Sequence, residues 1–371
     1  MHFDLSTEQR DLQASVRAFL AKESPTEAAR ELPETEQGYD PALWSRMADD
    51  LGLHALAVPE EHGGIGASFV ELVVVLEEMG RQLVPSPFFS SAVLATRALL
   101  RSGDVDAMSR LLPGLAEGTT IGTLALTEDD GSWDLDAVRL AAEPDGNGWA
   151  LTGAKAFVPD GQSAGLVLVV ARSAAGLCLF AVDGDAPGLS RSALPVLDGT
   201  RRLARLEFDR TPAVLVGADG AAGPGLRRAL EDAAVALGAE QIGAAQRCLD
   251  MAVGYAGTRV AFGRPIGSFQ AIKHKCADMV LDIESGRSAV WQAAWSVSVD
   301  GNDVPLAAAA VQAHCSEAYV RAAQQNIQIH GGIGFTWEHD AHLYLKRALS
   351  SRELLGAPDQ HLLRIADQMG L

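Results

Sequence analysis

Apolar residues recur at helical spacing along the first 120 residues. One face of the first segment carries Leu5, Leu12, Val16, Phe19 and Leu20. Ser6 stands before this segment as an N-cap, with acidic and amide residues in the first turn, which is how many helices begin. Similar patterns predict helices over residues 71–83 and 92–100, separated by Gly- and Pro-rich turns. We therefore expect an N-terminal helical domain over residues 1–120.

The pattern changes at about residue 121, where short β-prone runs replace the helical periods. Asp-Gly, Asn-Gly and Pro-Gly pairs separate these runs at the spacing of hairpins. The predicted strands cover residues 121–127, 137–142, 149–152, 166–171, 177–182 and 203–208. This part of the chain predicts a central antiparallel β-barrel or sandwich over residues 121–215.

A Gly- and Ala-rich joint at residues 217–225 leads into a third region with long helical periods. Helices are expected over residues 225–257, 270–299, 304–329 and 341–354. Long helices with short joints are typical of a bundle, so residues 225–371 predict a C-terminal four-helix bundle. The fold class expected for the whole chain is α+β multidomain.

The charge balance restricts the partners. The chain has 30 Lys and Arg residues against 48 Asp and Glu residues, a net charge of −18. Such an acidic surface argues against non-specific binding of nucleic acid or of an anionic membrane. An anionic ligand would therefore need a local cluster of Arg side chains and backbone N–H groups.

The spacing of the cysteines and the first residues of the sequence indicate the cellular compartment in which the protein is expected. Cys178, Cys248, Cys276 and Cys315 form no C-x-x-C pair, which fits thiols packed in a reducing cytosol. Residues 1–9 lack the basic and apolar regions of a signal peptide, and no apolar run approaches the length of a membrane span. We expect a cytoplasmic location.

Two short motifs carry most of the chemical information. The first, residues 259–270, contains Arg259, whose planar guanidinium suits a phosphate, and the apolar Phe262 beside it. The second, residues 328–336, contains Gly331 and Gly332, which end a helix and leave backbone groups open to a ligand.

Together and in this order, the two motifs resemble the C-terminal flavin-binding signature of the acyl-CoA dehydrogenase family. The order of helices, β domain and bundle is similar to the layout of that family over essentially the full chain. The resemblance implies FAD bound between β domain and bundle, with a second subunit closing over the dinucleotide. It assigns this half-site to Arg259, Phe262, Gln270, Gln328, Gly331 and Gly332.

The β domain should supply the other half of the flavin site. Residues 124–134 resemble the family loop Thr-Glu-Pro-x-Ala-Gly-Ser-Asp, which implies that Thr127 bonds the flavin ring and that Ser132 meets pyrophosphate or CoA oxygens. Phe157 matches the aromatic residue that lines the flavin. Two positions depart from the family: Asp129 replaces the Pro, and Pro159 replaces a Thr and can give no hydrogen bond to the flavin.

The family reaction needs a carboxylate base to remove the α-proton of an acyl thioester. The two positions at which the family places its Glu are Gly356 and Ala233 in this chain, and neither residue can take a proton. Glu240 is the remaining candidate, on a stripe of small residues that predicts burial. The alternative is a structural Glu240 paired with Arg247 or with a neighbouring helix.

No metal site is expected. His339 and His342 have the spacing of metal ligands but no third ligand nearby, so they are interpreted as the exposed start of a helix. The chain also has no Walker A loop and no Gly-x-Gly-x-x-Gly after a strand.

Three functions remain open. In the first, the chain is a subunit of an FAD-dependent acyl-CoA dehydrogenase, in a heterotetramer whose sister chain supplies the catalytic Glu. In the second, it is a catalytically silent subunit that completes the FAD site of the sister chain. The third function is a flavin-dependent monooxygenase or N-hydroxylase on the same fold, which needs no carboxylate base. The chain resembles the short subunits of actinobacterial α2β2 enzymes that act on sterol side-chain CoA thioesters. The partners implied are an acyl-CoA, a sister subunit or a homotetramer, and electron-transferring flavoprotein.

Overall fold

The computed structural model describes residues 5–371. By contacts between Cα atoms, the chain divides into two compact units, each built from separate stretches of sequence. The bundle unit consists of residues 1–31, 69–84 and 234–371, and the barrel unit of residues 32–68 and 85–233. The three predicted domain boundaries follow chain order and stay a prediction.

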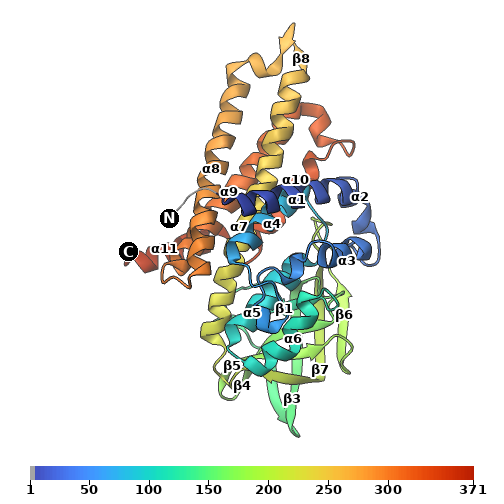
Figure 1. Ribbon diagram of the computed structural model, residues 1–371, viewed down its shortest axis with the longest axis vertical. Coiled ribbons are helices and arrows are strands. Elements are labelled where there is room, and N and C mark those ends of the chain that lie inside the picture. The colour runs from blue at the N-terminus through green and yellow to red at the C-terminus, as the bar shows by residue number, and fades with distance from the viewer. Residues whose placement is uncertain (1–4) are drawn as a thin grey trace. The chain divides into compact units, whose positions relative to one another are not determined.

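The bundle unit is helical (Figure 1). Its N-terminal stretches hold α1 (Thr7–Glu23), α2 (Ala28–Glu31) and α4 (Phe69–Gln82). Its C-terminal stretch holds most of α7 (Gly223–Thr258), then β8 (Val260–Ala261), β9 (Arg264–Pro265), η6 (Ile266–Ser268), α8 (Gln270–Ser298), α9 (Val304–His330), η7 (Gly331–Phe335), α10 (Ala341–Glu353) and α11 (Pro358–Met369). The β8–β9 hairpin caps one end of the long helices α7 and α8 (Figure 1).

The start of α1 is as predicted. The Ser6 hydroxyl accepts from the Gln9 N–H, and the Gln9 side chain accepts from the Ser6 N–H, a reciprocal capping box. The bundle prediction was incomplete, because α11 follows α10 and was not expected. Pro358 at the first position of α11 suits a helix start, a signal that was missed.

Two glycines let α4 and α7 approach each other closely. A Cβ atom on Gly80 would lie 1.9 Å from the Glu240 carbonyl oxygen, and one on Gly243 would lie 1.8 Å from the Glu77 carbonyl oxygen. No side chain fits in either space, so the crossing of these helices requires glycine at both positions.

The barrel unit combines short helices with the sheet. Its helices are η1 (Leu32–Glu34), α3 (Pro41–Asp49), η2 (Leu53–Ala55), η3 (Glu60–His62), a π-helix η4 (Phe89–Ala95), α5 (Thr96–Ser102), α6 (Val105–Ala116) and η5 (Leu135–Ala137). Its strands are β1 (Gly122–Ala125), β2 (Ala141–Asp145), β3 (Gly148–Pro159), β4 (Leu166–Ser173), β5 (Gly176–Asp183), β6 (Leu189–Ala193) and β7 (Leu203–Val216). The helix expected over residues 92–100 is thus a π-helix that continues into α5, and β6 was not predicted.

The sheet closes on itself, since β4, β2, β3, β7 and β5 pair in a ring, with β1 added to β4 and β6 to β7. The prediction of a purely antiparallel barrel was wrong. β1 runs parallel to β4 over four residue pairs, and β2 meets β4 in parallel at a single pair. Periodicity cannot reveal this, because it reports which face of a strand is buried and not the direction of its neighbour.

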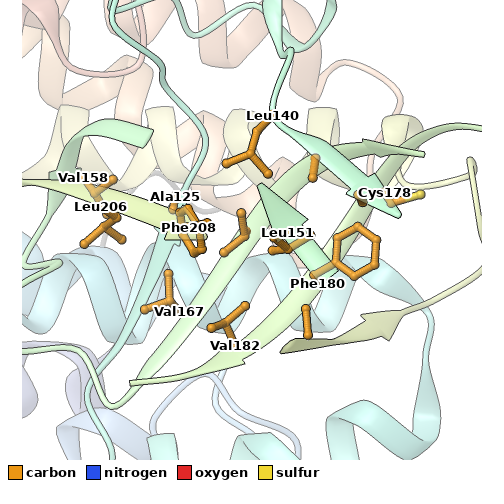
Figure 2. Packing of buried hydrophobic residues seen from close by; sticks show 14 of the residues in the cluster. Ala125, Leu140, Leu151, Val158, Val167, Cys178, Phe180, Val182, Leu206 and Phe208 are labelled. Atoms are coloured by element: carbon orange, nitrogen blue, oxygen red, sulfur yellow. The ribbon is translucent and has the colours of Figure 1, made fainter. Parts of the chain in front are cut away.

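Alternating side chains of the strands fill the inside of the barrel (Figure 2). Val167 and Val169 on β4 and Phe180 on β5 are among its fully buried members. The register of β3 against β7 shifts between Lys155 and Val158, which indicates a β-bulge. The bulge changes the side-chain alternation, so Lys155 is buried while Phe157 is exposed.

Candidate functional site

The ends of three bundle helices converge next to the two predicted flavin motifs. The Tyr255 ring near the end of α7 stacks on the His330 ring at the end of α9, with centroids 4.4 Å apart. Lys275 Nζ near the start of α8 donates to Gln325 Oε1 on α9 over 2.5 Å. The residues assigned to the neighbour's flavin therefore belong to one region of the bundle unit.

All six of these residues are exposed to solvent: Arg259, Phe262, Gln270, Gln328, Gly331 and Gly332. Phe262 is 95% exposed and has a positive φ of 53°, an unusual conformation for a bulky residue. A large apolar side chain held outward in a strained conformation is typical of a contact surface. The bundle half of the predicted site is thus available to another chain.

The glycine turn, residues 331–340, begins where α9 ends. Gly331 has a φ of 62° and its N–H donates to the Ile327 carbonyl. A Cβ atom placed on Gly331 or on Gly332 would meet nothing within 4 Å. The open backbone of the two glycines and the exposed guanidinium of Arg259 are the kinds of group that hold a phosphate, which takes hydrogen bonds from backbone N–H groups and charge from a guanidinium. This half of the site fits the pyrophosphate of FAD.

The barrel half is arranged differently. Thr127 is buried, and its hydroxyl donates to the Ala156 carbonyl oxygen over 2.5 Å. Phe157 is 42% exposed with a φ of 55°, and its ring lies beside Gly131. The structure therefore brings Thr127 and Phe157 to the same loop, but the hydroxyl proton of Thr127 is already engaged.

The acidic loop, residues 128–140, satisfies its own N–H donors. The Ser132 N–H donates to the Asp130 carboxylate over 3.1 Å, and the Ser132 hydroxyl accepts from the Asp134 N–H over 3.2 Å. The loop also carries the carboxylates Glu128, Asp129 and Asp136. A phosphate at Ser132 would have to displace the Asp130 carboxylate from this N–H and would lie among further carboxylates. The residues around Ser132 therefore do not fit an anion, although its assignment stays a prediction.

A buried lysine, missed in the sequence, fastens this loop. Lys155 Nζ donates to the Leu126 carbonyl over 2.8 Å and to Glu128 Oε1 over 2.9 Å. The same carboxylate oxygen accepts from the N–H groups of Arg139 and Leu140, so one acid joins the two ends of the loop. Burial lowers the pKa of Lys155 to about 8, against the opposing effect of Glu128. Although burial raises the pKa of Glu128, its hydrogen bonds to Lys155 and the two N–H groups hold that pKa below its usual value.

Two further cations hold the acidic loop. Arg205 on β7 forms an ion pair with Asp129, the residue that replaces the family's Pro. Arg172 on β4 donates to the carbonyl oxygens of Val138 and Leu135. The loop is thus fixed by side chains from three strands.

Neither family position for the base can hold one without rebuilding. Gly356 has a φ of 105°, and a Cβ atom on it would lie 2.9 Å from Gln360 Oε1 and 3.3 Å from His361 Nε2. An L-residue is strained in that backbone conformation, and a side chain there would also require the end of the Gln360 side chain to move. Ala233 is fully buried in the barrel unit.

Glu240 is buried, at 6% exposure, and Arg347 Nη1 on α10 lies 2.5 Å from its Oε1. The sequence predicts Arg247 or a neighbouring helix as the structural partner of Glu240. The partner in the structure is Arg347 on the helix α10. A carboxylate held by a guanidinium is stabilised in its charged form and is oriented toward that partner. This contact gives Glu240 a structural role, while its role as a base stays an untested prediction.

The findings on metal ligands and on membrane-spanning helices apply to the part of the chain that the structure describes. Within residues 5–371, no group of three His, Cys, Asp or Glu side chains could hold a metal ion. In the same range, no helix combines the length and hydropathy that a membrane span needs. All four cysteines are free thiols.

Comparison with known families covers almost the whole chain. Models of the acyl-CoA dehydrogenase N-terminal, middle and C-terminal domains match residues 6–119, 123–211 and 225–370. A curated relative, acyl-CoA dehydrogenase IpdE2 of Mycobacterium tuberculosis, is 37% identical over 365 residues, which cover 98% of this chain and 97% of the relative.

Two solved structures are similar over their full lengths. The ChsE4–ChsE5 complex from Mycobacterium tuberculosis superposes with a TM-score of 0.90 at 30% identity, covering 100% of this chain and 99% of that one. A variant of the Tcur3481–Tcur3483 steroid ACAD gives a TM-score of 0.87 at 32% identity, with 98% of each chain covered. The chain belongs to the acyl-CoA dehydrogenase family.

Proposed function

We propose that this chain is one subunit of a heteromeric, FAD-dependent acyl-CoA dehydrogenase. Its bundle unit would complete the flavin site of a sister chain, and the sister chain would supply the catalytic Glu. The observation that carries the proposal is the contrast between six exposed residues of the predicted flavin motifs in the bundle unit and a base position occupied by Gly356, whose φ of 105° strains any other residue.

FAD, when bound, would accept the hydride that leaves the β-carbon of the acyl-CoA. The residues of this chain would act on the cofactor rather than on the reacting carbons. Arg259 would pair with a pyrophosphate oxygen, and Gly331 and Gly332 would admit the phosphates close to their backbone. Phe262 would cover an apolar face of the cofactor on the neighbouring subunit.

The barrel unit also supports a role for this chain in completing the sister chain's flavin site rather than in binding a flavin of its own. In the acidic loop, the N–H groups of Ser132 and Asp134 donate to the Asp130 carboxylate and to the Ser132 hydroxyl, and Pro159 has no N–H. We infer that Thr127, Ser132 and Phe157 do not bind a flavin in this chain, so that the complex holds fewer flavins than chains. This corresponds to a subunit that is silent on its own.

The relatives' names support both the partner and the substrate class. The ChsE4–ChsE5 structure is a complex of two chains, and the Tcur3481–Tcur3483 structure is a steroid ACAD. We propose that the substrate is the CoA thioester of a steroid-derived acyl group, and that an electron-transferring flavoprotein reoxidises the flavin. No observation favours the monooxygenase alternative.

The decisive experiment compares the chain alone with its native complex. The tagged chain is purified alone and also together with the sister chain that co-purifies from its own cells, and bound flavin is counted per chain. We expect a colourless chain alone and a yellow, active complex with about one flavin per two chains. A yellow single chain that reduces an artificial acceptor with an acyl-CoA would overturn the proposal.

A substitution then tests the half-site directly. Arg259→Met in this chain should raise the dissociation constant of FAD from the complex roughly 10- to 100-fold, the usual effect of losing a charge-assisted hydrogen bond. Arg46→Met is the matched control, because it removes a partly exposed guanidinium that pairs with Asp50 on the barrel unit. Equal flavin affinity in both variants would exclude Arg259 from the site.

A further inference from the structure

A stack of three rings lies directly behind the glycine turn. Tyr255 on α7 is parallel to His330 within 28°, at 4.4 Å between centroids. His339, near the end of the turn, packs on His330 at 4.2 Å with an angle of 48°. His330 is therefore held between α7 and the residue that closes the turn.

The contact between the two histidines joins the ends of the turn. His330 is the last residue of α9, and His339 comes directly before Asp340, the N-cap of α10. His330 is buried, and its Nδ1 lies 2.8 Å from the Asn326 carbonyl oxygen. Because a carbonyl only accepts, this nitrogen carries the proton. Gly331 and Gly332, which lie between the two rings in sequence, stay open to solvent.

Arg30 ties the outer side of the same turn. Its guanidinium donates to the Trp337 carbonyl oxygen and, from Nε over 2.9 Å, to the Asp340 carboxylate. Lys346 lies over the Trp337 ring at 4.3 Å, and the His342 ring meets it edge-on at 4.7 Å. The rings on one side and Arg30 on the other thus hold the segment that follows the two glycines.

We infer that His339, packed on His330, which itself stacks on Tyr255, is a positioning residue that holds the glycine turn in the conformation that receives the flavin phosphates of a sister subunit. This inference rests on the proposed function for its ligand, but the positioning itself is a property of this chain. The Tyr255–His330–His339 stack replaces the rigidity that two exposed glycines cannot supply.

The same contact makes the turn sensitive to acid. His339 Nδ1 accepts from the Ala341 N–H over 3.1 Å, so a proton on Nδ1 would break that bond. The charged groups around His339 are His330, Arg30, Asp340 and His342. Burial, then His330, lowers the pKa of His339 below its usual value, against the opposing effect of Asp340. Since the unfolded turn takes up this proton first, the ordered turn loses stability as pH falls below about 6.5.

Hydrogen exchange on the purified chain tests the positioning without any flavin. The amides to follow are those of Gly331 and Thr336, which donate to Ile327 and Ile333 within the chain. In His339→Ala both should exchange roughly five-fold faster, as expected for the loss of a stacked ring pair. His339→Phe restores a ring that cannot titrate and should return most of the protection at neutral pH.

The matched control is His314→Ala. His314 lies on the same helix α9, is half-buried and has one backbone partner, the Asp282 carbonyl oxygen. This variant should leave the exchange of Gly331 and Thr336 unchanged. Unchanged exchange in His339→Ala as well would overturn the inference, whatever happens to flavin.

The flavin arm uses the co-purified complex and FAD as the probe. The dissociation constant of FAD should rise several-fold in His339→Ala, and acidification from pH 7.5 to 5.5 should weaken FAD binding more in the wild type than in His339→Phe. Equal acid sensitivity in these two proteins would overturn the acid-sensing part. A loosened turn with unchanged FAD affinity would leave the positioning standing and overturn the proposed half-site, so the two failures can be told apart.

Discussion

The acidic loop and the glycine turn are two solutions to holding an irregular segment still. The acidic loop turns its carboxylates onto its own N–H groups, and Lys155, Arg172 and Arg205 fasten it from the strands. The glycine turn keeps its backbone bare and is fixed from behind by rings. In the proposed function, the acidic loop does not bind an anion, and the glycine turn is the segment that receives the flavin phosphates.

The comparison teaches that, under the proposed function, the lack of a Glu at the two family positions is accompanied by other departures from the family's site. A chain that had lost only its Glu would still keep open donors in the acidic loop. Here the Ser132 and Asp134 N–H groups are satisfied within the loop, Pro159 cannot donate, and the φ of 105° at Gly356 strains any residue with a side chain. These three features lie far apart in the sequence and agree in direction.

The largest expected effect is on the acidic loop. Glu128→Ala leaves Lys155 buried without its charged partner and frees the N–H groups of Arg139 and Leu140. Breaking a buried pair in this way should lower the free energy of unfolding by about 3 kcal/mol, measured by denaturant titration. Glu143→Ala, an exposed Glu on β2, is the control.

Hydrogen exchange in the same variant tests whether the acidic loop and the glycine turn are held independently of each other. In Glu128→Ala the amides of Arg139 and Leu140 should lose protection while those of Gly331 and Thr336 keep theirs. Loss of protection in both segments would mean that they are not independent, and the contrast between the acidic loop and the glycine turn would fail.

Titration of Lys155 should stabilise the protein at alkaline pH. Its pKa in the folded protein is about 8, below the ordinary value of 10.5, so the unfolded chain binds the extra proton between these values. The free energy of unfolding of the wild type relative to Lys155→Met should therefore rise by roughly 1–3 kcal/mol from pH 8 to pH 10. A difference that does not change with pH would show that Lys155 titrates normally.

Gly356→Ala probes the position of the missing base. The substitution puts a Cβ atom 2.9 Å from Gln360 Oε1 at a φ of 105°, and the resulting strain should cost about 1–2 kcal/mol. Gly356→Glu should be destabilised at least as much and should give the isolated chain no acyl-CoA dehydrogenase activity. Turnover by that variant would show that the site lacks only a carboxylate.

Gly332→Ala should have the smallest effect on stability and a clear effect on flavin. Its Cβ atom would enter open space, so the free energy of unfolding should change by less than about 0.5 kcal/mol. A methyl group there would stand where a phosphate is expected, and FAD binding to the complex should weaken several-fold. A stability loss equal to that of Gly356→Ala would contradict the view that this turn is open.

Much of the fold was predictable because it follows from local patterns. The capping box at Ser6, the long helices of the bundle unit and most strands of the barrel were found from spacing and turn residues. One error concerns a feature without a local signal, and another concerns a local signal that was overlooked. The parallel β1–β4 pairing is a choice of neighbour, and α11 was missed although Pro358 marks its start.

The site divides in the same way. The two flavin motifs and the missing base can be read along the chain, because each is a short run or a single residue at a recognisable place. The partners cannot be read there: Glu240 and Arg347 are 107 residues apart, and Lys155 and Glu128 are 27 apart. Periodicity marks Glu240 as buried but names no partner for it.

The sequence alone predicted the family, the residues of the two flavin motifs and the lack of a Glu at the two family positions, because these depend on which residue stands at which position. The tertiary structure decided which hydrogen-bond donors of the acidic loop and the glycine turn have a partner within the chain. This depends on distances between segments that lie far apart in the sequence. His339 illustrates both: its spacing to His342 suggested an exposed helix start, and packing made it the ring that closes the glycine turn.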